Sequence, residues 1–234
     1  MKINRAAIKQ NAKNIISTAK PSPILIGIAF ICIAWTLEFL MLTVSGHYEV
    51  YMKTMEQIMA GNLDYIPIMP KVNPWGAALG IAILMMLIMM KVGFTIYCMN
   101  ICHFRNAGLG NLFDGFAIFF KSLWLHILMF AFVYLWSLLL IVPGIIAAYR
   151  YRMALYIMLD NPQLSAMECI RASKEMMDGR KGELFVLDLS FLGWYLLAAF
   201  PFVTIWVTPY TSVTYTNYYI ALRDMPVSEY DLQI

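Results

Sequence analysis

The sequence predicts an all-α protein: a polytopic transmembrane helix bundle of about six spans, with one additional cytoplasmic amphipathic helix. Hydrophobic residues make up 61% of the 234 residues and charged residues only 13%, about half the charged share of a soluble domain. The mean hydropathy is +0.67. Long apolar runs alternate with shorter polar segments. So few charges cannot cover a globule in water, and we expect lipid to be the solvent of most of the chain.

Residues 1–22 form a basic amphipathic N-terminal segment. It contains no acidic residue, and isoleucine and alanine recur in it at helical spacing. Its basic residues are Lys2, Arg5, Lys9, Lys13 and Lys20. Such a segment is typical of helices that lie on an anionic membrane surface, which would make anionic lipid its partner. The alternative is that its charges only fix the orientation of the chain.

Residues 23–222 form the predicted bundle, and residues 223–234 form a polar tail. A helix of about 20 apolar residues crosses a hydrocarbon core of about 30 Å. The predicted spans are residues 23–44, 75–98, 117–142, 143–159, 183–200 and 202–222. The polar segment 45–74 is an outer loop with one helix around residues 48–60.

Two proline positions are predicted to break helices. Pro143 and Gly144 interrupt a continuous apolar stretch, and Pro209 lies inside the sixth span. Proline removes a backbone donor and clashes with the preceding helical turn. At Pro143 the prediction is a tight hairpin between two spans, and the alternative is one long kinked helix.

A polar helix is predicted over residues 165–178. Ser165 and Glu168 have the spacing of a capping box, in which each side chain bonds a backbone amide of the first turn. Gly179 ends the helix. Met167, Ile170 and Met177 line one side of it, with charged residues on the opposite side.

The orientation of the chain follows from lysine and arginine in short loops. Residues 1–22 and 160–182 are basic, whereas the outer loop holds two lysines over its length. The N-terminus is therefore predicted to be cytoplasmic. Six spans place the C-terminus in the cytoplasm as well, and five spans would place it outside.

Motifs from residue 138 to 222 resemble one known family. A proline-glycine break and a tyrosine-rich stretch are followed by NPQLS at 161–165, SKEMM at 173–177 and WVTPY at 206–210. With FDGFAIFFKS and NRAAIKQNAK upstream, they resemble the bacterial membrane family called domain of unknown function 975. The resemblance implies an integral protein of the bacterial cell membrane. It implies no activity, because none is established for the family.

Charged residues in apolar segments are the candidates for function, because an ionised side chain in the bilayer costs about 2.5–3.5 kcal/mol on insertion scales. Glu38 lies in the first span, Lys91 late in the second, and Arg150 and Arg152 close to the end of the fourth. Asp188 lies in the fifth span and is predicted to pair with one of the arginines. Structural pairing or access to the membrane surface is the alternative for each. His126 is interpreted as a satisfied core histidine.

The sixth span is rich in threonine, serine and tyrosine, with Tyr210 directly after Pro209. Hydroxyl groups in lipid bond to the backbone or to facing helices. This polar helix is predicted either to be the most buried helix of the bundle or to line a pathway.

No catalytic motif is present, and we expect neither an enzyme, a cofactor, a metal site nor nucleic-acid binding. The favoured function is a multi-pass cell-membrane protein that acts through a protein partner, lipid or a membrane-active peptide. Its predicted working surfaces are the helix at 165–178 and the loop at 45–74. The alternative is a small transporter or channel that uses the intramembrane charges and the sixth span. The two hypotheses differ in whether a hydrated cavity reaches those charges.

Overall fold

The computed structural model describes residues 3–62, 64–68, 74–198 and 200–225, and this part of the chain is all-helical. The rest of the predicted tail, residues 226–234, lies outside the described residues. The helices are α1 (Arg5–Thr18), α2 (Pro23–Val44), α3 (His47–Met59), α4 (Pro74–Cys102), α5 (Asn111–Ala117), α6 (Phe119–Leu139), α7 (Ile141–Tyr151), α8 (Ala154–Asp160), α9 (Ala166–Met176), α10 (Lys181–Leu189), α11 (Leu192–Leu197) and α12 (Pro201–Arg223).

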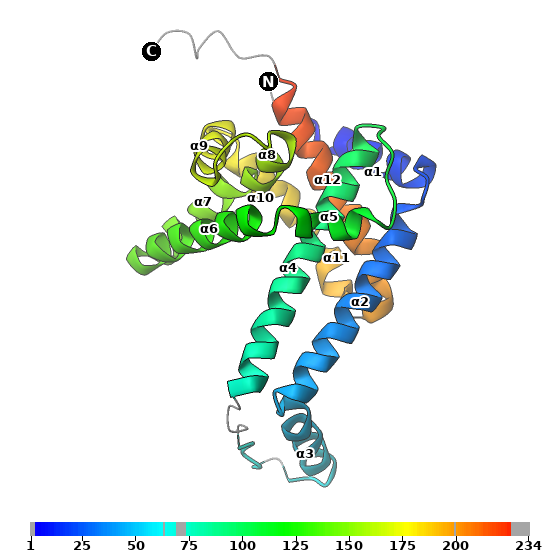
Figure 1. Cartoon of the computed structure of the whole chain (residues 1–234), viewed down its shortest axis with the longest axis vertical. Helices are drawn as coiled ribbons and strands as arrows, with labels where there is room; N and C mark the ends of the chain where they lie inside the picture. Colours follow the sequence, from blue (N-terminus) through cyan, green and yellow to red (C-terminus); the bar gives the residue numbers. More distant parts are fainter. Residues whose placement is uncertain (1–2, 63, 69–73, 199, 226–234) are drawn as a thin grey trace.

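Three of these helices are long and apolar enough to cross a membrane: α2, α4 and α6. Ser22 caps α2 and Pro23 begins it, where the missing proline donor costs nothing. The helices α2 and α4 lie side by side and extend toward α3 (Figure 1). The helix expected in the outer loop is confirmed as α3, and Gly61 follows it in the left-handed conformation (φ 83°).

The N-terminal helix α1 packs on the bundle rather than standing apart from it. Asn4 caps it by accepting hydrogen bonds from the backbone amides of Ala6 and Ala7. Its apolar side, formed by Ile8, Ala12 and Ile15, is buried, and α1 lies against α12. The apolar side of α1 is therefore covered by protein.

Helices α4 and α5 touch through their backbones. A Cβ atom at Gly93 would lie 2.6 Å from the carbonyl oxygen of Asn111, closer than real Cβ atoms approach other atoms. Only glycine permits this approach. The contact holds α5 against the C-terminal part of α4.

Helices α6 and α7 form a hairpin, as predicted, and not one kinked helix (Figure 1). The chain reverses at Leu140, whose backbone is extended (φ −162°, ψ 151°). The predicted break at Pro143 and Gly144 is therefore misplaced by three residues, because both lie inside the first turns of α7. Gly144 instead allows close packing, since a Cβ atom there would lie 2.9 Å from Cα of Ser137.

The predicted fourth and fifth spans are each divided between two short helices. The fourth is divided between α7 and α8 at residues 152–153, and the fifth between α10 and α11 at residues 190–191. Ser173 of α9 stabilises the first division: its hydroxyl donates to the Arg150 carbonyl (2.8 Å) and accepts from the Met153 amide (3.2 Å).

Helix α12 is continuous, with Pro209 inside it. The predicted break at this proline is therefore wrong. Pro209 is buried and faces Gly27 of α2, where an added Cβ would lie 3.4 Å from the proline ring. Packing against α2 thus helps to keep the helix continuous through a residue that disfavours a helix interior.

Helix α9 begins with the predicted capping box. Ser165 Oγ accepts from the Glu168 amide (3.3 Å), and Glu168 Oε2 accepts from the Ser165 amide (2.7 Å). Cys169, Ile170 and Ser173 are buried on one side of the helix. A helix is therefore present at the predicted residues, and it packs against α6, α7 and α8.

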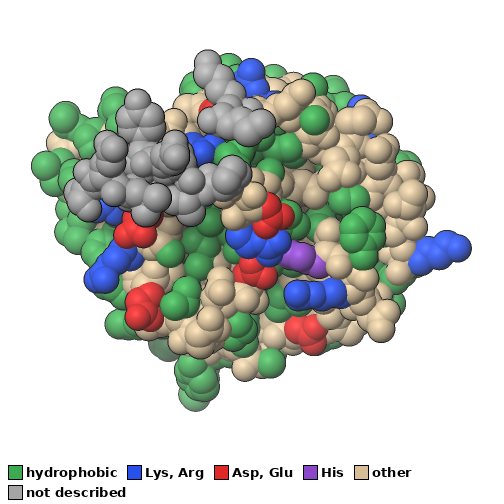
Figure 2. Space-filling view, turned by 90° about the horizontal axis from the view of Figure 1, so that it is seen from above, with side chains coloured by type: hydrophobic (Ala, Val, Ile, Leu, Met, Phe, Trp, Pro, Cys, Tyr) green, Lys and Arg blue, Asp and Glu red, His purple; other side chains and the backbone are tan. Residues whose placement is uncertain are grey.

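The end of the molecule opposite α3 is its charged end. Arg223 Nη1 donates to Asp160 Oδ2 (2.7 Å) and lies 3.0 Å from His103 Nε2, and the Tyr219 hydroxyl also donates to Asp160 (3.0 Å). These bonds join the ends of α4, α8 and α12. Figure 2 shows Lys, Arg, Asp and Glu side chains gathered on this face.

Burial opposes ionisation of Asp160, but the hydrogen bonds from Arg223 and Tyr219 outweigh it and lower the pKa of the carboxyl below its ordinary value.

Candidate functional site

A cavity of about 820 Å³ lies between α4, the α6–α7 hairpin and α12, with side chains from α8 and α11 completing its wall. The α6–α7 hairpin diverges from the α2–α4 pair (Figure 1). Its polar lining residues are Lys91, Thr95, His126, Tyr151, Arg152, Tyr156, Tyr195, Thr204, Thr208, Thr211, Ser212 and Tyr215.

The cavity carries positive charge. Lys91 and Arg152 line it together with His126, and none of the lining residues is Asp or Glu. Both Lys91 and Arg152 are exposed to the cavity space. Within the described ranges, no hydrogen bond or ion pair engages the side-chain nitrogens of either residue. These donors are therefore available to a ligand.

Arg152 is held in place by an aromatic ring. Its guanidinium carbon lies 4.9 Å from the centroid of the Tyr215 ring, a distance at which the ring face attracts a cation. The Tyr215 hydroxyl donates to Asp188 Oδ1 (2.6 Å) and lies 3.1 Å from the hydroxyl of Tyr195. Asp188 thus orients the ring on which the guanidinium rests.

Asp188 itself lies behind the cavity wall. Its second oxygen accepts from the Tyr149 hydroxyl (2.9 Å), so two tyrosines from α7 and α12 meet on one carboxylate. The predicted pairing of Asp188 with an arginine is indirect: no ion pair joins them in the described part of the chain, and Tyr215 lies between Asp188 and Arg152. The carboxylate of Asp188 therefore acts on Arg152 through the Tyr215 ring and forms no hydrogen bond with the guanidinium N–H groups.

Helix α12 presents a row of hydroxyl groups to the cavity. Thr204 and Thr211 donate to the backbone carbonyls of Ala198 (3.1 Å) and Val207 (2.8 Å). Thr208 and Ser212 lie one helical turn apart, and their hydroxyls donate to no residue that the structure describes. Further along the helix, Thr214, Thr216 and Asn217 are buried instead. The two predictions for this helix, a pathway lining and a buried core, each describe one part of it.

The remaining wall of the cavity is apolar. It is formed by side chains of α4, α6 and α8, among them Ile88, Val92, Met129, Phe130, Val133 and Leu155. A ligand in this space meets cations and hydroxyls on one side and hydrocarbon on the other. The arrangement suits a molecule with an anionic group and an apolar body.

The predicted site residues do not form one cluster. Lys91 and Arg152 line the cavity, and Asp188 lies directly behind it. Glu38 is exposed on α2, outside the cavity lining and without an ion pair among the described residues. Arg150 points elsewhere, with a buried Nε that bonds no described residue. Tyr210 lines a second pocket on another side of α12.

Sequence reasoning missed several contributors to the site. His126 was interpreted as a core histidine, and its Nδ1 does donate to the Ser122 carbonyl (2.8 Å), yet the ring lines the cavity. Tyr149 and Tyr195 were not identified. Their partners lie 39 and 20 residues away in the chain, and no local pattern signals such contacts.

Residues 138–225 match the protein family described as "Protein of unknown function (DUF975)". The predicted resemblance is therefore confirmed over this part of the chain, which holds α7 to α12 and with them Arg152, Asp188 and the hydroxyl row of α12. No curated protein and no solved structure matches the chain.

Proposed function

We propose that this protein is a multi-pass protein of the bacterial cell membrane that binds an anionic amphiphile in the cavity between α4, the α6–α7 hairpin and α12. The observation that carries the proposal is the cavity's unpaired cations: Lys91 and Arg152 line one space that holds no carboxylate. A charged group away from water is costly unless it has a partner. A phosphate or carboxylate bound between Lys91 and Arg152 supplies that partner.

The apolar wall supports an amphiphile rather than a free anion. Ile88, Met129 and Phe130 offer surface whose burial against an apolar tail stabilises the complex by about 25 cal/mol per Å². Charge-assisted hydrogen bonds at the head group contribute about 1.5–3 kcal/mol each. The hydroxyls of Thr208 and Ser212 provide further donors for the oxygens of the head group.

Transport of the same molecule is the second candidate function. A transporter needs a cavity that reaches its intramembrane charges, and this cavity includes two of the charges that the sequence singled out, with the hydroxyl row of α12 beside them. The acidic Glu38 plays no part in it, because that side chain lies outside the lining. Binding is common to both functions and is tested first.

We infer no enzymatic role, because the lining consists of cations, hydroxyls and apolar groups and the sequence carries no catalytic motif. Interaction with a protein or peptide partner through α9 or the loop at 45–74 is a separate hypothesis.

For the topology, we propose that α1, α9 and the C-terminal end of α12 are cytoplasmic and that α3 lies outside. This orientation is supported by the basic residues of α1 and by the position of α3 at the opposite end of the molecule (Figure 1). Six crossings require α7–α8, α10–α11 and α12 to cross in addition to α2, α4 and α6. Labelling of a single cysteine introduced as Leu140→Cys with an impermeant thiol reagent tests the third crossing, that of α6: if no label is taken up from outside, six crossings are excluded.

The binding test uses protein in phosphatidylcholine nanodiscs and two probes, 11-(dansylamino)undecanoic acid and its methyl ester. We expect the acid to bind at least about tenfold more tightly than the ester, because the loss of one charge-assisted contact costs about 1.4 kcal/mol or more. Arg152→Gln and Lys91→Gln are each expected to lower the affinity of the protein for the acid probe by about tenfold or more. Equal affinity for acid and ester contradicts the proposal.

The control is Lys53→Gln, which removes the same charge from an exposed position on α3. It is expected to leave the affinity unchanged. Gel filtration of each variant separates loss of binding from loss of the fold. Lys91 is exposed and makes no side-chain bond to the described chain, so its variant is expected to fold even if Arg152→Gln does not. Wild-type affinity in the Lys91 variant also contradicts the proposal.

A further inference from the structure

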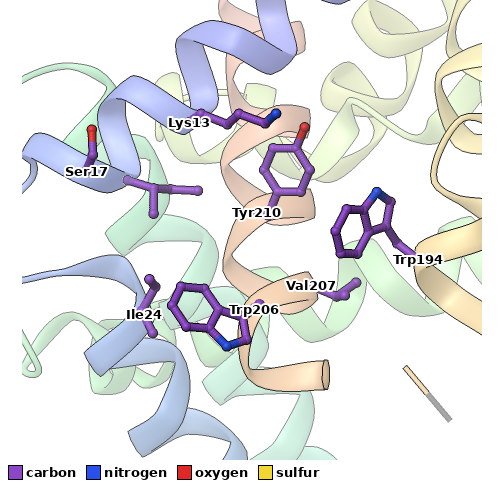
Figure 3. A pocket seen from close by; sticks show the side chains of 8 residues that line it. Lys13, Ser17, Ile24, Trp194, Trp206, Val207 and Tyr210 are labelled. Atoms are coloured by element: carbon purple, nitrogen blue, oxygen red, sulfur yellow. The ribbon is translucent and has the colours of Figure 1, made fainter. Parts of the chain in front are cut away.

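A second pocket, of about 390 Å³, lies between α1, α2, α11 and α12. Figure 3 shows its lining, which consists of Lys13, Ile16, Ser17, Ile24, Trp194, Trp206, Val207 and Tyr210. Val207 alone of these also lines the large cavity. The pocket is thus a separate space on another side of α12, within the usual range of about 300–1,000 Å³ for small-ligand pockets.

The polar groups of this pocket gather at one end. Figure 3 shows the Lys13 amino group and the Tyr210 hydroxyl pointing to the same end, while Ile24 and Trp206 lie at the other. Neither the Lys13 amino group nor the Tyr210 hydroxyl bonds a residue that the structure describes. No acidic residue lines the pocket. Its charge is therefore complementary to an anionic group with an apolar chain attached.

The position of the pocket favours a membrane lipid. Ile24 is the second residue of α2, so the pocket lies where this candidate span begins. Tryptophan and tyrosine are enriched at that depth, between head groups and hydrocarbon. The sequence holds no Asp or Glu before Glu38, and α1 adds Arg5 and Lys9 to the positive field. A basic segment of this kind attracts anionic lipid.

We propose that this pocket binds one anionic phospholipid, with its phosphate against Lys13 and Tyr210 and one acyl chain along Ile24, Trp194 and Trp206. The bound lipid joins α1 to α2, α11 and α12. This site is independent of the large cavity and of any ligand there. It differs from a general attraction of α1 to the membrane surface, because it assigns the head group to one lysine and the chain to two indoles.

The experiment measures quenching of tryptophan fluorescence by brominated lipid. The reporter variant keeps Trp206 and has phenylalanine at the other five tryptophans, Trp35, Trp75, Trp124, Trp136 and Trp194. Phosphatidylcholine nanodiscs contain the same mole fraction of either phosphatidylglycerol or phosphatidylcholine brominated on one acyl chain. We expect phosphatidylglycerol to quench Trp206 at least about twofold more, because a lipid held at Lys13 keeps its chain at the indole. Equal quenching by the two lipids overturns the proposal.

Lys13→Gln is expected to abolish the preference for phosphatidylglycerol, and Arg5→Gln is the matched control. Arg5 lies on the same helix and carries the same charge but does not line the pocket. Equal loss in both variants means attraction to the basic helix as a whole and overturns the assigned site. Arg152→Gln is expected to leave this quenching unchanged, so failure here and failure in the cavity are distinguishable.

If the reporter variant does not fold, native mass spectrometry is done on the Lys91→Gln chain, which keeps all six tryptophans and in which the large cavity is expected to bind anions more weakly. We expect one phosphatidylglycerol to remain bound after delipidation in this chain and when Arg5→Gln is added, and to be lost when Lys13→Gln is added. Retention of the lipid after Lys13→Gln is added overturns the proposal.

Discussion

Helices α2 and α4 have 22 and 29 residues, whereas α7, α8, α10 and α11 have 11, 7, 9 and 6. The long pair satisfies its backbone groups within each helix and leaves apolar side chains exposed, which suits lipid. The short helices have many ends, and at each end backbone N–H or C=O groups lack a partner within the helix. Side chains such as Ser173, which bonds backbone groups on both sides of the α7–α8 division, complete them.

The two regions also differ in the environment of a carboxylate side chain. Glu38 on α2 is exposed and has no ion pair within the described chain. Asp188 on α10 accepts hydrogen bonds from Tyr149 and Tyr215. The partly buried carboxylate network thus lies among the short helices, and the cavity forms where these helices meet the long helix α4.

The largest effect is expected from Gly93→Ala, which acts on the long-helix side of this boundary. An added Cβ would lie 2.6 Å from the Asn111 carbonyl oxygen, and backbone cannot move aside as a flexible side chain can. We expect a loss of about 3 kcal/mol, the upper end of ordinary overpacking, measured as the free energy of unfolding in mixed detergent micelles. Gly80→Ala on the same helix is the control, because its nearest neighbour would be 4.0 Å away. A wild-type unfolding midpoint for Gly93→Ala would contradict the close α4–α5 contact.

A medium effect is expected from Asp188→Asn. The amide oxygen can accept from one tyrosine hydroxyl, but the amide NH₂ group faces the other donor, so one charge-assisted bond is lost and the second is weakened. We expect a loss of about 2 kcal/mol in the free energy of unfolding. Glu38→Gln is expected to change it by less than about 0.5 kcal/mol. Similar losses in the two variants would erase the distinction between the two carboxylates.

The smallest effect concerns pH and the charged end of the molecule. The pKa of Asp160 is lowered in the folded state, so its stabilisation is fully present above the unfolded value of about 4 and is lost as pH falls through the folded pKa. We expect Asp160→Asn to cost about 1 kcal/mol or less near neutral pH, because Arg223 is partly exposed. The difference in unfolding midpoint between wild type and variant, measured from about pH 6 to pH 3, is expected to shrink toward the acid end. A constant difference would show that the carboxylate charge is not its source.

The sequence predicted the long-helix region closely. The apolar run from Pro23 to Val44 coincides with α2, and α4 starts and ends within a few residues of the second predicted span. Hydropathy is sufficient there because each helix satisfies its own backbone. The capping box of α9 was equally readable, since Ser165 and Glu168 are neighbours in the chain.

The short-helix region was predicted less well, because its structure depends on contacts between distant residues. Nothing local to Arg152 indicates that the chain divides there, since the division is stabilised by Ser173 from another helix. Proline was a poor guide: Pro209 lies inside a continuous helix because α2 packs against it. Lys91 and Arg152 were predicted from the sequence as unusual charges, but only the arrangement of the helices brings them to one cavity.

The tip of the α6–α7 hairpin, residues 138–142, is apolar and exposed at every position. Pro143 follows it and has no amide hydrogen that would need a partner. During biosynthesis such a tip has no charged residue to move through hydrocarbon, where each would cost about 2.5–3.5 kcal/mol. In the proposed topology the segment that joins α2 to α4 also crosses; it carries Glu49, Lys53 and Glu56, and we expect it to need a protein-conducting channel. The α6–α7 hairpin can partition sideways into lipid as a folded unit, so its insertion need not wait for that channel.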